Sequence, residues 1–389
     1  MSVFSDPTVG IADPFMRRAG ECALRGRGTV SPNPLVGCVV VADGEVAGEG
    51  YHHHAGGPHA EVVALDAAGD RARGSHVYVT LEPCNHTGRT PPCAERLIAA
   101  GVSRVTIGMA DPNPEVTGRG ADALAAAGVG VTWVDDPGPF QALNEPWLHR
   151  LATGRPFVRV KIAVSLDGHI ALADGARAAI TGPGGAGLTH RLRSEATAVA
   201  VGARTLAADD PLLTVRDEDG TRSARQPLRV VLARDTVPES GARLFAEDPA
   251  ECAVVIAESA PPAALEPLAD RGVAILRYPM AAGIEGGLRA LAEHGIDDVL
   301  VEAGSRLFTA LWDASLIDEL VVVTAGGIAG PGAPPLYRDP RVPAAESLTW
   351  EMRATETAVV GEDAAVVWRP RATPAARTDE RSDDGCSPA

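Results

Sequence analysis

The chain has 389 residues, of which 45% are hydrophobic and 4% aromatic, and it carries a formal net charge of −16. This length exceeds what one hydrophobic core usually organises, so we expect two domains, and the apolar fraction excludes a disordered or fibrous protein. The acidic charge argues against a nonspecific nucleic-acid binder, because such binding depends on Lys and Arg side chains that neutralise phosphates.

No apolar run approaches the about 20 residues of a membrane helix, and no basic segment followed by an apolar one opens the chain. We therefore expect a cytoplasmic protein without a membrane partner. The six cysteines are too few and too scattered for a disulfide framework, so metal ligation is the better hypothesis for them. Residues 371–389 are rich in Arg, Asp, Ser and Pro, which predicts a disordered tail that includes Cys386.

The first half of the chain alternates apolar strands with helical segments, as α/β proteins do. Helices are predicted over 61–68 and 94–100, the second ending at Gly101. The strands are predicted over 35–41, 77–81, 105–109 and 131–134. Residues 135–139 interrupt the pattern, so we place the first domain at 1–146 and the second at 147–370.

The second half repeats the alternation without resembling the first half, which favours a fusion of two different α/β domains over a duplication. A strand ends at Glu302, and Gly304 and Ser305 open a helix through Trp312, a helix start suited to a dinucleotide phosphate. No Gly-x-Gly-x-x-Gly follows the first strand, so a doubly wound dinucleotide fold is not supported. Its strands are predicted over 158–164, 198–202, 228–233, 252–257, 273–277, 298–302 and 320–324.

His59, Cys84 and Cys93 have the residue types of a catalytic zinc site, in which one imidazole and two thiolates leave the fourth position open. Glu61 follows His59 at the start of a predicted helix, where it can act as a general acid and base without binding the metal. Both cysteines follow a proline, and Cys93 sits at a predicted helix start, which favours thiolates. Residues 52–54 are three further histidines that compete as ligands, and we interpret His53 and His54 as a solvated loop.

Four segments strongly resemble the deaminase domain of the bifunctional deaminase/reductase family of riboflavin biosynthesis. They are residues 33–40 (NPLVGCVV), 48–52 (GEGYH), 59–61 (HAE) and 80–93 (TLEPCNHTGRTPPC). Most cytidine-deaminase relatives space the two cysteines as Cys-x-x-Cys, whereas eight residues intervene between Cys84 and Cys93 here. The long spacing and the acidic charge both oppose a nucleic-acid editing deaminase.

The resemblance implies an N-terminal cytidine-deaminase-like αβα domain that binds zinc and hydrolytically deaminates a small-molecule pyrimidine ribotide, 2,5-diamino-6-(5-phosphoribosylamino)pyrimidin-4(3H)-one. It makes Asn33 and His52 contacts to the pyrimidine or ribose, and His86 and Arg89 candidates for the ribose-phosphate end. These roles suit the side chains, because an amide both donates and accepts and a phosphate needs cationic donors. We also expect a homo-oligomer.

Residues 155–168 are similar to the opening strand of that family's reductase domain, which has a dihydrofolate-reductase-like α/β fold. Segments 181–183, 191–193, 201–202, 205–211, 213–216 and 301–305 continue the resemblance in order. It implies an NADPH-dependent reduction of the ribosyl group to a ribityl chain, with substrate contacts at Arg193, Leu213, Arg216 and Glu302. The implied NADPH contacts are Ala163, Ser165, Thr205, Asp209 and the loop from Gly304 to Ala310, which includes Gly304, Ser305, Arg306 and Leu307.

Two departures from the family pattern concern the reductase. Arg177, Ala178 and Ala179 stand where the family usually shows Ser-x-Trp, and His169 replaces the Arg of an Asp-Gly-Arg motif. They leave open an alternative in which an active deaminase is joined to a degenerate, noncatalytic or altered-specificity reductase domain. We expect an active reductase, because the two arginines and Glu302 persist.

Overall fold

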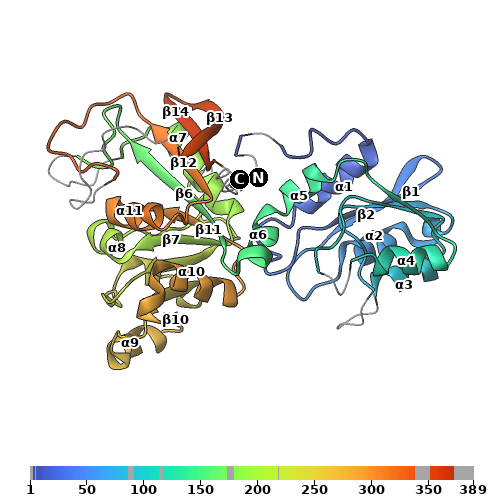
Figure 1. Ribbon diagram of the computed structural model, residues 1–389, viewed down its shortest axis with the longest axis horizontal. Coiled ribbons are helices and arrows are strands. Elements are labelled where there is room, and N and C mark those ends of the chain that lie inside the picture. Colours follow the sequence, from blue (N-terminus) through green and yellow to red (C-terminus); the bar gives the residue numbers. More distant parts are fainter. Residues whose placement is uncertain are drawn as a thin grey trace, which may run out of the picture.

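The computed structural model describes residues 3–4, 6–85, 92–113, 117–172, 179–217, 219–337 and 351–371, which form two α/β units (Figure 1). The first contains a five-stranded sheet of order β2-β1-β3-β4-β5, in which β1 is antiparallel to β2 and β3 and the remaining pairs are parallel. Its strands are β1 (Gly37–Ala42), β2 (Glu45–Tyr51), β3 (His76–Val79), β4 (Arg104–Ile107) and β5 (Gly130–Trp133).

Helices cover both faces of this sheet, because side chains along a buried strand alternate between two cores. Cys38 and Val40 of β1 pack into the core on one side, and Val39 and Val41 into the core on the other. The first face is covered by α2 (Ala60–Ala68), α3 (Cys93–Ala100) and α4 (Arg119–Ala126), and a 3₁₀ turn (Gly69–Ala72) follows α2. The second is covered by α1 (Pro14–Leu24), α5 (Gly138–Leu143) and α6 (Glu145–Thr153).

Strand β2 was not predicted, because its sequence EVAGEGY has no apolar run and two glycines. The structure explains the glycines by the close approach of α2. A Cβ atom at Gly48 would lie 2.3 Å from the carbonyl oxygen of Ala64, and one at Gly50 would lie 2.6 Å from that of Ala60. The absence of side chains lets the helix pack directly on the strand.

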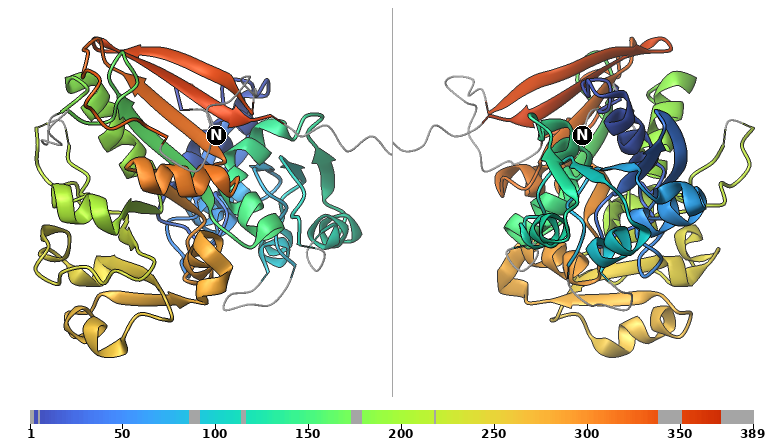
Figure 2. Two further views of the ribbon diagram at one scale, coloured as in Figure 1. Left: turned by 60° about the vertical axis from the view of Figure 1, so that its left-hand side comes forward. Right: turned by 90° about the vertical axis from the view of Figure 1, so that its right-hand side faces the viewer.

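The second unit contains a nine-stranded sheet of order β10-β9-β8-β7-β11-β6-β12-β14-β13. Its strands pair in parallel except for the β13–β14 hairpin, which adds antiparallel strands to the β12 edge and was not predicted. The hairpin lies at the top of both views in Figure 2. The strands are β6 (Phe157–Val164), β7 (Ala198–Gly202), β8 (Leu228–Leu232), β9 (Cys252–Ala257), β10 (Ala274–Tyr278), β11 (Asp298–Glu302), β12 (Glu319–Thr324), β13 (Met352–Val360) and β14 (Asp363–Pro370).

Helices again form a core on each face of this sheet. One core includes residues of α7 (Pro183–Glu195), α8 (Ala203–Asp209) and α9 (Pro262–Ala269), and the other includes residues of α10 (Gly283–Glu293) and α11 (Ser305–Asp313). Short 3₁₀ helices lie at Arg243–Phe245, Pro249–Glu251 and Met280–Ala282. Strand β11 lies between β6 and β7, so the carboxyl ends of these three parallel strands meet at one edge of the sheet.

Helix α6 joins the two units, and the predicted boundary at residues 146 and 147 falls inside it. At the other end of the chain, the backbone N–H of Arg371 donates to the carbonyl oxygen of Glu351 at 2.9 Å. Residues 372–389 of the predicted tail lie outside the described residues. None of the helices in the described part of the chain combines the length and apolar character needed to cross a bilayer.

Candidate active sites

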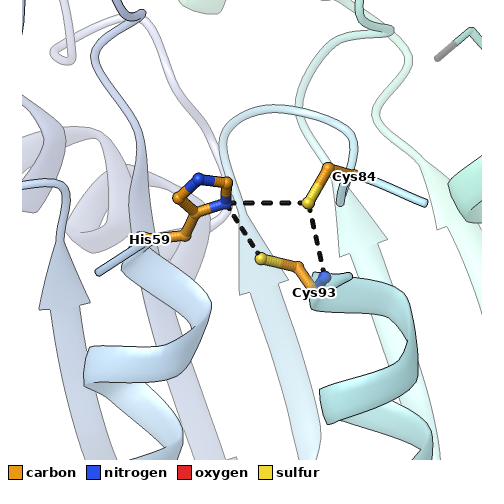
Figure 3. A group of neighbouring side chains, drawn as sticks. All are labelled: His59, Cys84 and Cys93. Atoms are coloured by element: carbon orange, nitrogen blue, oxygen red, sulfur yellow. Dashed lines mark hydrogen bonds between the residues drawn. The ribbon is translucent and has the colours of Figure 1, made fainter. Parts of the chain in front are cut away.

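The three predicted zinc ligands lie together at the ends of two helices and a strand-following loop (Figure 3). His59 immediately precedes α2, Cys84 follows β3, and Cys93 is the first residue of α3. The Nδ1 atom of His59 lies 3.2 Å from Sγ of Cys93 and 3.6 Å from Sγ of Cys84. The structure therefore brings all three side chains together with one imidazole nitrogen facing both sulfurs.

These distances fit a zinc ion. Zn–S bonds of about 2.3 Å and Zn–N bonds of about 2.0 Å, in tetrahedral geometry, place nitrogen and sulfur ligands about 3.5 Å apart. The three donor atoms all lie within 4.8 Å of one another, and no other such group of His, Cys, Asp or Glu occurs within the described ranges. His53 and His54 are exposed and take no part: His53 stacks on Tyr51, and Nδ1 of His54 donates to the carbonyl oxygen of Ala55.

Hydrogen bonding makes the Cys84 thiol acidic. Contacts with the Cys93 thiol and with His59 lower the pKa of Cys84 well below its ordinary value of 9.0, although burial opposes this. The backbone N–H of Cys93 also donates to Sγ of Cys84 at 3.3 Å. Because the thiolate is the form that binds metal, the start of α3 prepares Cys84 as a ligand.

Glu61 lies one residue inside α2 and is only 3% exposed. Burial raises the pKa of Glu61 to about 7, although the neighbouring charge of His59 acts in the opposite direction. A carboxyl group that titrates near neutral pH can both accept and release a proton there.

Asn33 and His52 lie beside the zinc ligands. The rings of His52 and His59 meet edge to face with centroids 5.8 Å apart. Nδ1 of His52 donates to the carbonyl oxygen of Pro58 at 2.9 Å, so its Nε2 accepts from Nδ2 of Asn33 at 3.0 Å. Burial lowers the pKa of His52, which favours this neutral form. The other two predicted substrate contacts, His86 and Arg89, lie outside the described residues.

The second domain contains a cavity of about 1440 Å³ at the carboxyl ends of β6, β7, β8 and β11. Most predicted cofactor and substrate residues line it: Ala163, Thr205, Asp209, Gly304, Ser305, Arg306, Leu307, Arg193, Leu213 and Glu302. Ser165 and Arg216 are not among its lining residues. The Ser165 hydroxyl donates to Asp167 Oδ1 at 2.6 Å, and the guanidinium of Arg216 donates to the carbonyl oxygen of Gly220 at 3.0 Å.

Arg193 and Glu302 form a two-point ion pair at the wall of the cavity. Nε and Nη2 of Arg193 lie 2.5 and 2.9 Å from the two carboxylate oxygens of Glu302, and Nη1 donates to the carbonyl oxygen of Thr214. Burial opposes ionisation of Glu302, but the charge and hydrogen bonds of Arg193 outweigh it and lower the pKa of Glu302. The guanidinium of Arg193 is therefore held in place by Glu302 and the Thr214 carbonyl oxygen.

Comparisons with known proteins cover both domains. Residues 156–366 match the family model "RibD C-terminal domain", and residues 11–109 match "Cytidine and deoxycytidylate deaminase zinc-binding region". The Riboflavin biosynthesis protein RibD of Escherichia coli is 41% identical over 328 residues, covering 82% of this chain and 89% of the relative. A solved structure of Acinetobacter baumannii RibD superposes with a TM-score of 0.81 at 36% identity, covering 92% of this chain and 98% of that one.

The chain belongs to the RibD family. It is therefore a bifunctional enzyme of riboflavin biosynthesis, a deaminase followed by a reductase, and its cofactors are zinc and NADPH. This confirms the predicted fold class and family. Another solved structure, described as a "diaminohydroxyphosphoribosylaminopyrimidine deaminase/ 5-amino-6-(5-phosphoribosylamino)uracil reductase" from Thermotoga maritima, has a TM-score of 0.76 at 34% identity and covers 92% of this chain and 98% of that one. Nothing in these relatives or in the described residues supports the alternative of a noncatalytic second domain.

The cavity of the reductase domain also contains Lys161, to which the sequence analysis gave no role. Lys161 is opposite Glu302 in the register of β6 and β11 and lines the cavity. Burial lowers the pKa of Lys161, although the charge of Glu302 opposes this. The available signal was a lysine in an otherwise apolar buried strand, where a charge is seldom placed without a partner or a function.

The lining residues fit NADPH by their chemistry. Helix α11 begins at the cavity behind Gly304, so the free N–H groups of its first turn are available to a phosphate. Arg204 and Arg234 also line the cavity, and neither forms an ion pair with any carboxylate in the described segments. Both arginines were missed, because nothing in the local sequence distinguishes them from ordinary surface residues.

Of the two departures from the family pattern, Ala179 lines the cavity, whereas Arg177 and Ala178 lie outside the described residues. His169 lies nearby in the chain, with Nδ1 3.3 Å from Asp167 Oδ2 and its backbone N–H donating to the Ser165 hydroxyl. Ala179 therefore presents only a methyl group to the cavity.

Glu82, in the motif that contains Cys84, binds the backbone of a neighbouring helix and does not face a binding site. Its carboxylate accepts hydrogen bonds from the backbone N–H groups of Gly118 at 3.0 Å, Gly120 at 3.2 Å and Ala121 at 3.3 Å, at the start of α4. A carboxylate is stabilised at a helix N-terminus. Glu82 thereby fixes the backbone two residues before Cys84, the predicted zinc ligand.

Proposed function

We propose that the first domain removes an amino group by hydrolysis from 2,5-diamino-6-(5-phosphoribosylamino)pyrimidin-4(3H)-one, and that the second reduces the ribosyl group of the product to a ribityl chain. The observation that carries the proposal is the cluster of His59, Cys84 and Cys93 beside a buried Glu61, in a chain whose other domain has a large cavity. The activities named for the Thermotoga maritima relative support the choice of substrates.

In the deaminase, we assign His59, Cys84 and Cys93 to zinc and Glu61 to proton transfer. Zinc bound there supplies a nucleophile at neutral pH by lowering the pKa of water to about 7. Glu61 would take one proton from the attacking water and deliver it to the ring nitrogen. It would then take the proton of the added hydroxyl and deliver it to the departing amine as the carbonyl forms. The buried His52 holds Asn33 with its carbonyl oxygen free to accept from the pyrimidine edge, and His86 and Arg89 are proposed for the phosphate.

In the reductase, NADPH supplies the hydride. We assign Ala163, Thr205, Asp209 and residues 304–307 to the cofactor, with Arg204 and Arg234 as cationic donors to its phosphates. Lys161, Arg193, Leu213 and Glu302 are proposed to contact the sugar phosphate, with the ammonium of Lys161 donating a hydrogen bond to the sugar. The resemblance also assigns Ser165 to NADPH and Arg216 to the substrate. Both stay proposals, because neither residue lines the cavity.

We also propose the domain limits 1–146 and 147–370, a homo-oligomer, and a cytoplasmic location. An oligomer is supported by β13, an edge strand of the nine-stranded sheet on which Val359 is 80% exposed. A reducing compartment is supported by the five described cysteines, all of which are free.

The test is to incubate the purified chain with the diaminopyrimidinone ribotide, with and without NADPH, and to identify the products by mass. Without NADPH we expect replacement of one amino group by oxygen, with release of ammonia. With NADPH we expect two further hydrogens in the product and oxidation of one equivalent of cofactor. A deaminated product that never oxidises NADPH would reject the proposed second step.

A further inference from the structure

The loop between α1 and β1, residues 25–36, carries Asn33 and is held by the reductase domain. We propose that the reductase domain positions this loop for deamination, with Ser31 and Asp297 as the positioning residues. The proposal rests on the proposed role of Asn33 as a contact to the pyrimidine substrate. In this proposal a contact between the two domains contributes to deamination, although neither Ser31 nor Asp297 touches the substrate.

Ser31 makes the central contact. Its Oγ lies 2.7 Å from both the carbonyl oxygen of Gly295 and Oδ2 of Asp297, and it accepts from the backbone N–H of Asp297 at 3.1 Å. Asp297 immediately precedes β11 of the reductase sheet and is only 5% exposed. The hydroxyl of a deaminase loop is thus fixed by a rigid and buried part of the other domain.

Arg150 of α6 closes the same network. Its Nε pairs with Oδ1 of Asp297, and its Nη2 donates to the carbonyl oxygen of Pro32 at 2.9 Å. Asp297 therefore holds the loop twice, directly through Ser31 and through Arg150. A charge-assisted network in a partly buried place restrains its members more strongly than exposed contacts do.

Asn33 lies between two fixed points of the chain. Two residues before it, Ser31 is bound to the reductase domain; two residues after it, Leu35 exchanges backbone hydrogen bonds with the side chain of the buried Asn144, at 2.7 and 3.0 Å. Releasing Ser31 removes one of the restraints on the side of Asn33 that faces the reductase domain. The hydrogen bonds from Arg150 to the carbonyl oxygen of Pro32 and from Asn33 to His52 remain, so the segment is loosened rather than freed. The amide would have to be reordered when the substrate binds, which weakens binding.

Two further contacts join the same loop to the reductase domain. Arg27 forms an ion pair with Glu195 at 3.0 Å, with both side chains largely buried. Nη2 of Arg225 donates to the carbonyl oxygen of Gly28 at 2.8 Å and to that of Ala196 at 2.7 Å. The contacts extend over residues 27–31 and lead directly to Asn33, which is the pattern expected of a support for a binding loop.

The test compares deamination and reduction in full-length variants, with the diaminopyrimidinone ribotide and the deaminated ribotide as substrates. We expect Ser31→Ala and Asp297→Asn each to raise the KM of deamination about five- to tenfold. The kcat of deamination, the zinc content and the reductase KM should stay within about twofold of the unchanged chain. Ser31→Thr, which retains the hydroxyl, should restore most of the deaminase KM.

Glu356→Ala is the matched control. Its carboxylate accepts from the backbone N–H groups of Val3 and Phe4 at 2.9 to 3.1 Å, so it holds the N-terminal end of the chain, rather than the loop, on the reductase domain. An equal rise of the deaminase KM in Glu356→Ala, or a matching rise of the reductase KM in Ser31→Ala, would overturn the proposal, because general domain adhesion would then explain the effect.

Asn33→Ala separates the two proposals. If Asn33→Ala raises the deaminase KM and both Ser31→Ala and Asp297→Asn leave it unchanged, the role of Asn33 stands and the positioning role is rejected. If Asn33→Ala also leaves the KM unchanged, Asn33 is not a substrate contact and both proposals fail.

Discussion

The deaminase site takes its proposed metal ligands and Glu61 from three short segments at the ends of α2, β3 and α3, whereas the reductase cavity is lined from the ends of at least four strands and the helices after them. In the first site, function depends on a few atoms of definite chemistry within 4.8 Å of one another. In the second site, function depends on the shape of a cavity of about 1440 Å³ and on the charged side chains distributed around it. A single substitution should therefore abolish deamination, whereas a single substitution in the cavity should only weaken reduction.

The sharpest test of this contrast is Glu61→Gln. Loss of the proton carrier should lower the kcat of deamination about 10²- to 10⁴-fold, because general acid–base catalysis contributes that much. Zinc should remain bound, since Glu61 is not a ligand, and reduction of the deaminated substrate should be unchanged. Metal analysis and ammonia release on the same sample measure both. Deamination at the unchanged rate would mean that another group carries the proton.

Lys161→Met tests the corresponding charge in the reductase. The methionine has similar length but no ammonium, so we expect NADPH oxidation to slow about 100-fold. Deamination by the same sample is the internal control and should be unaffected. A rate within about twofold of the unchanged chain would show that Lys161 is only a wall residue.

Arg204→Ala tests whether charge at the cavity rim holds the cofactor. Removing one cationic donor to a phosphate should raise the Kd for NADPH about tenfold, with a weaker dependence on salt. Fluorescence titration measures binding without turnover. Arg353→Ala, at an exposed position of β13, is the matched control and should leave the Kd unchanged. Equal values for both variants would remove Arg204 from the cofactor site.

The smallest effect concerns stability and pH. The pKa of Glu302 in the folded chain is lowered from its ordinary value of 4.5, chiefly because the charge of Arg193 outweighs burial. Its contribution to stability is therefore present above about pH 4.5 and is lost as the pH falls below that value. Glu302→Gln should lower the free energy of unfolding at pH 7 by about 1–3 kcal/mol, and the difference should shrink below pH 4. Denaturant titrations at the two pH values measure this, and a difference that does not depend on pH would contradict the ion pair.

Local sequence was enough for most of the fold. Strands such as 198–202 and 252–257 were predicted with their observed bounds. Both are short apolar runs between polar segments, which is the pattern typical of a strand buried in a parallel sheet. Strand β2 and strand β13 were missed because they are half-exposed and lack a long apolar run, whereas β14 contains the run AAVVW and was overlooked. Their place is decided by packing against α2 and by pairing with β12.

The sequence by itself determined a two-domain α/β fold of the RibD family with zinc and NADPH as cofactors, and it proposed His59, Cys84 and Cys93 as zinc donors beside Glu61. These depend on residue types and spacings within short segments, which the chain carries before it folds. Only the tertiary structure decided that Lys161 and Arg204 line the reductase cavity, that Ser165 and Arg216 do not, and that Ser31 meets Asp297. Those contacts join residues far apart in the chain, and no local pattern encodes which distant surfaces will pack together.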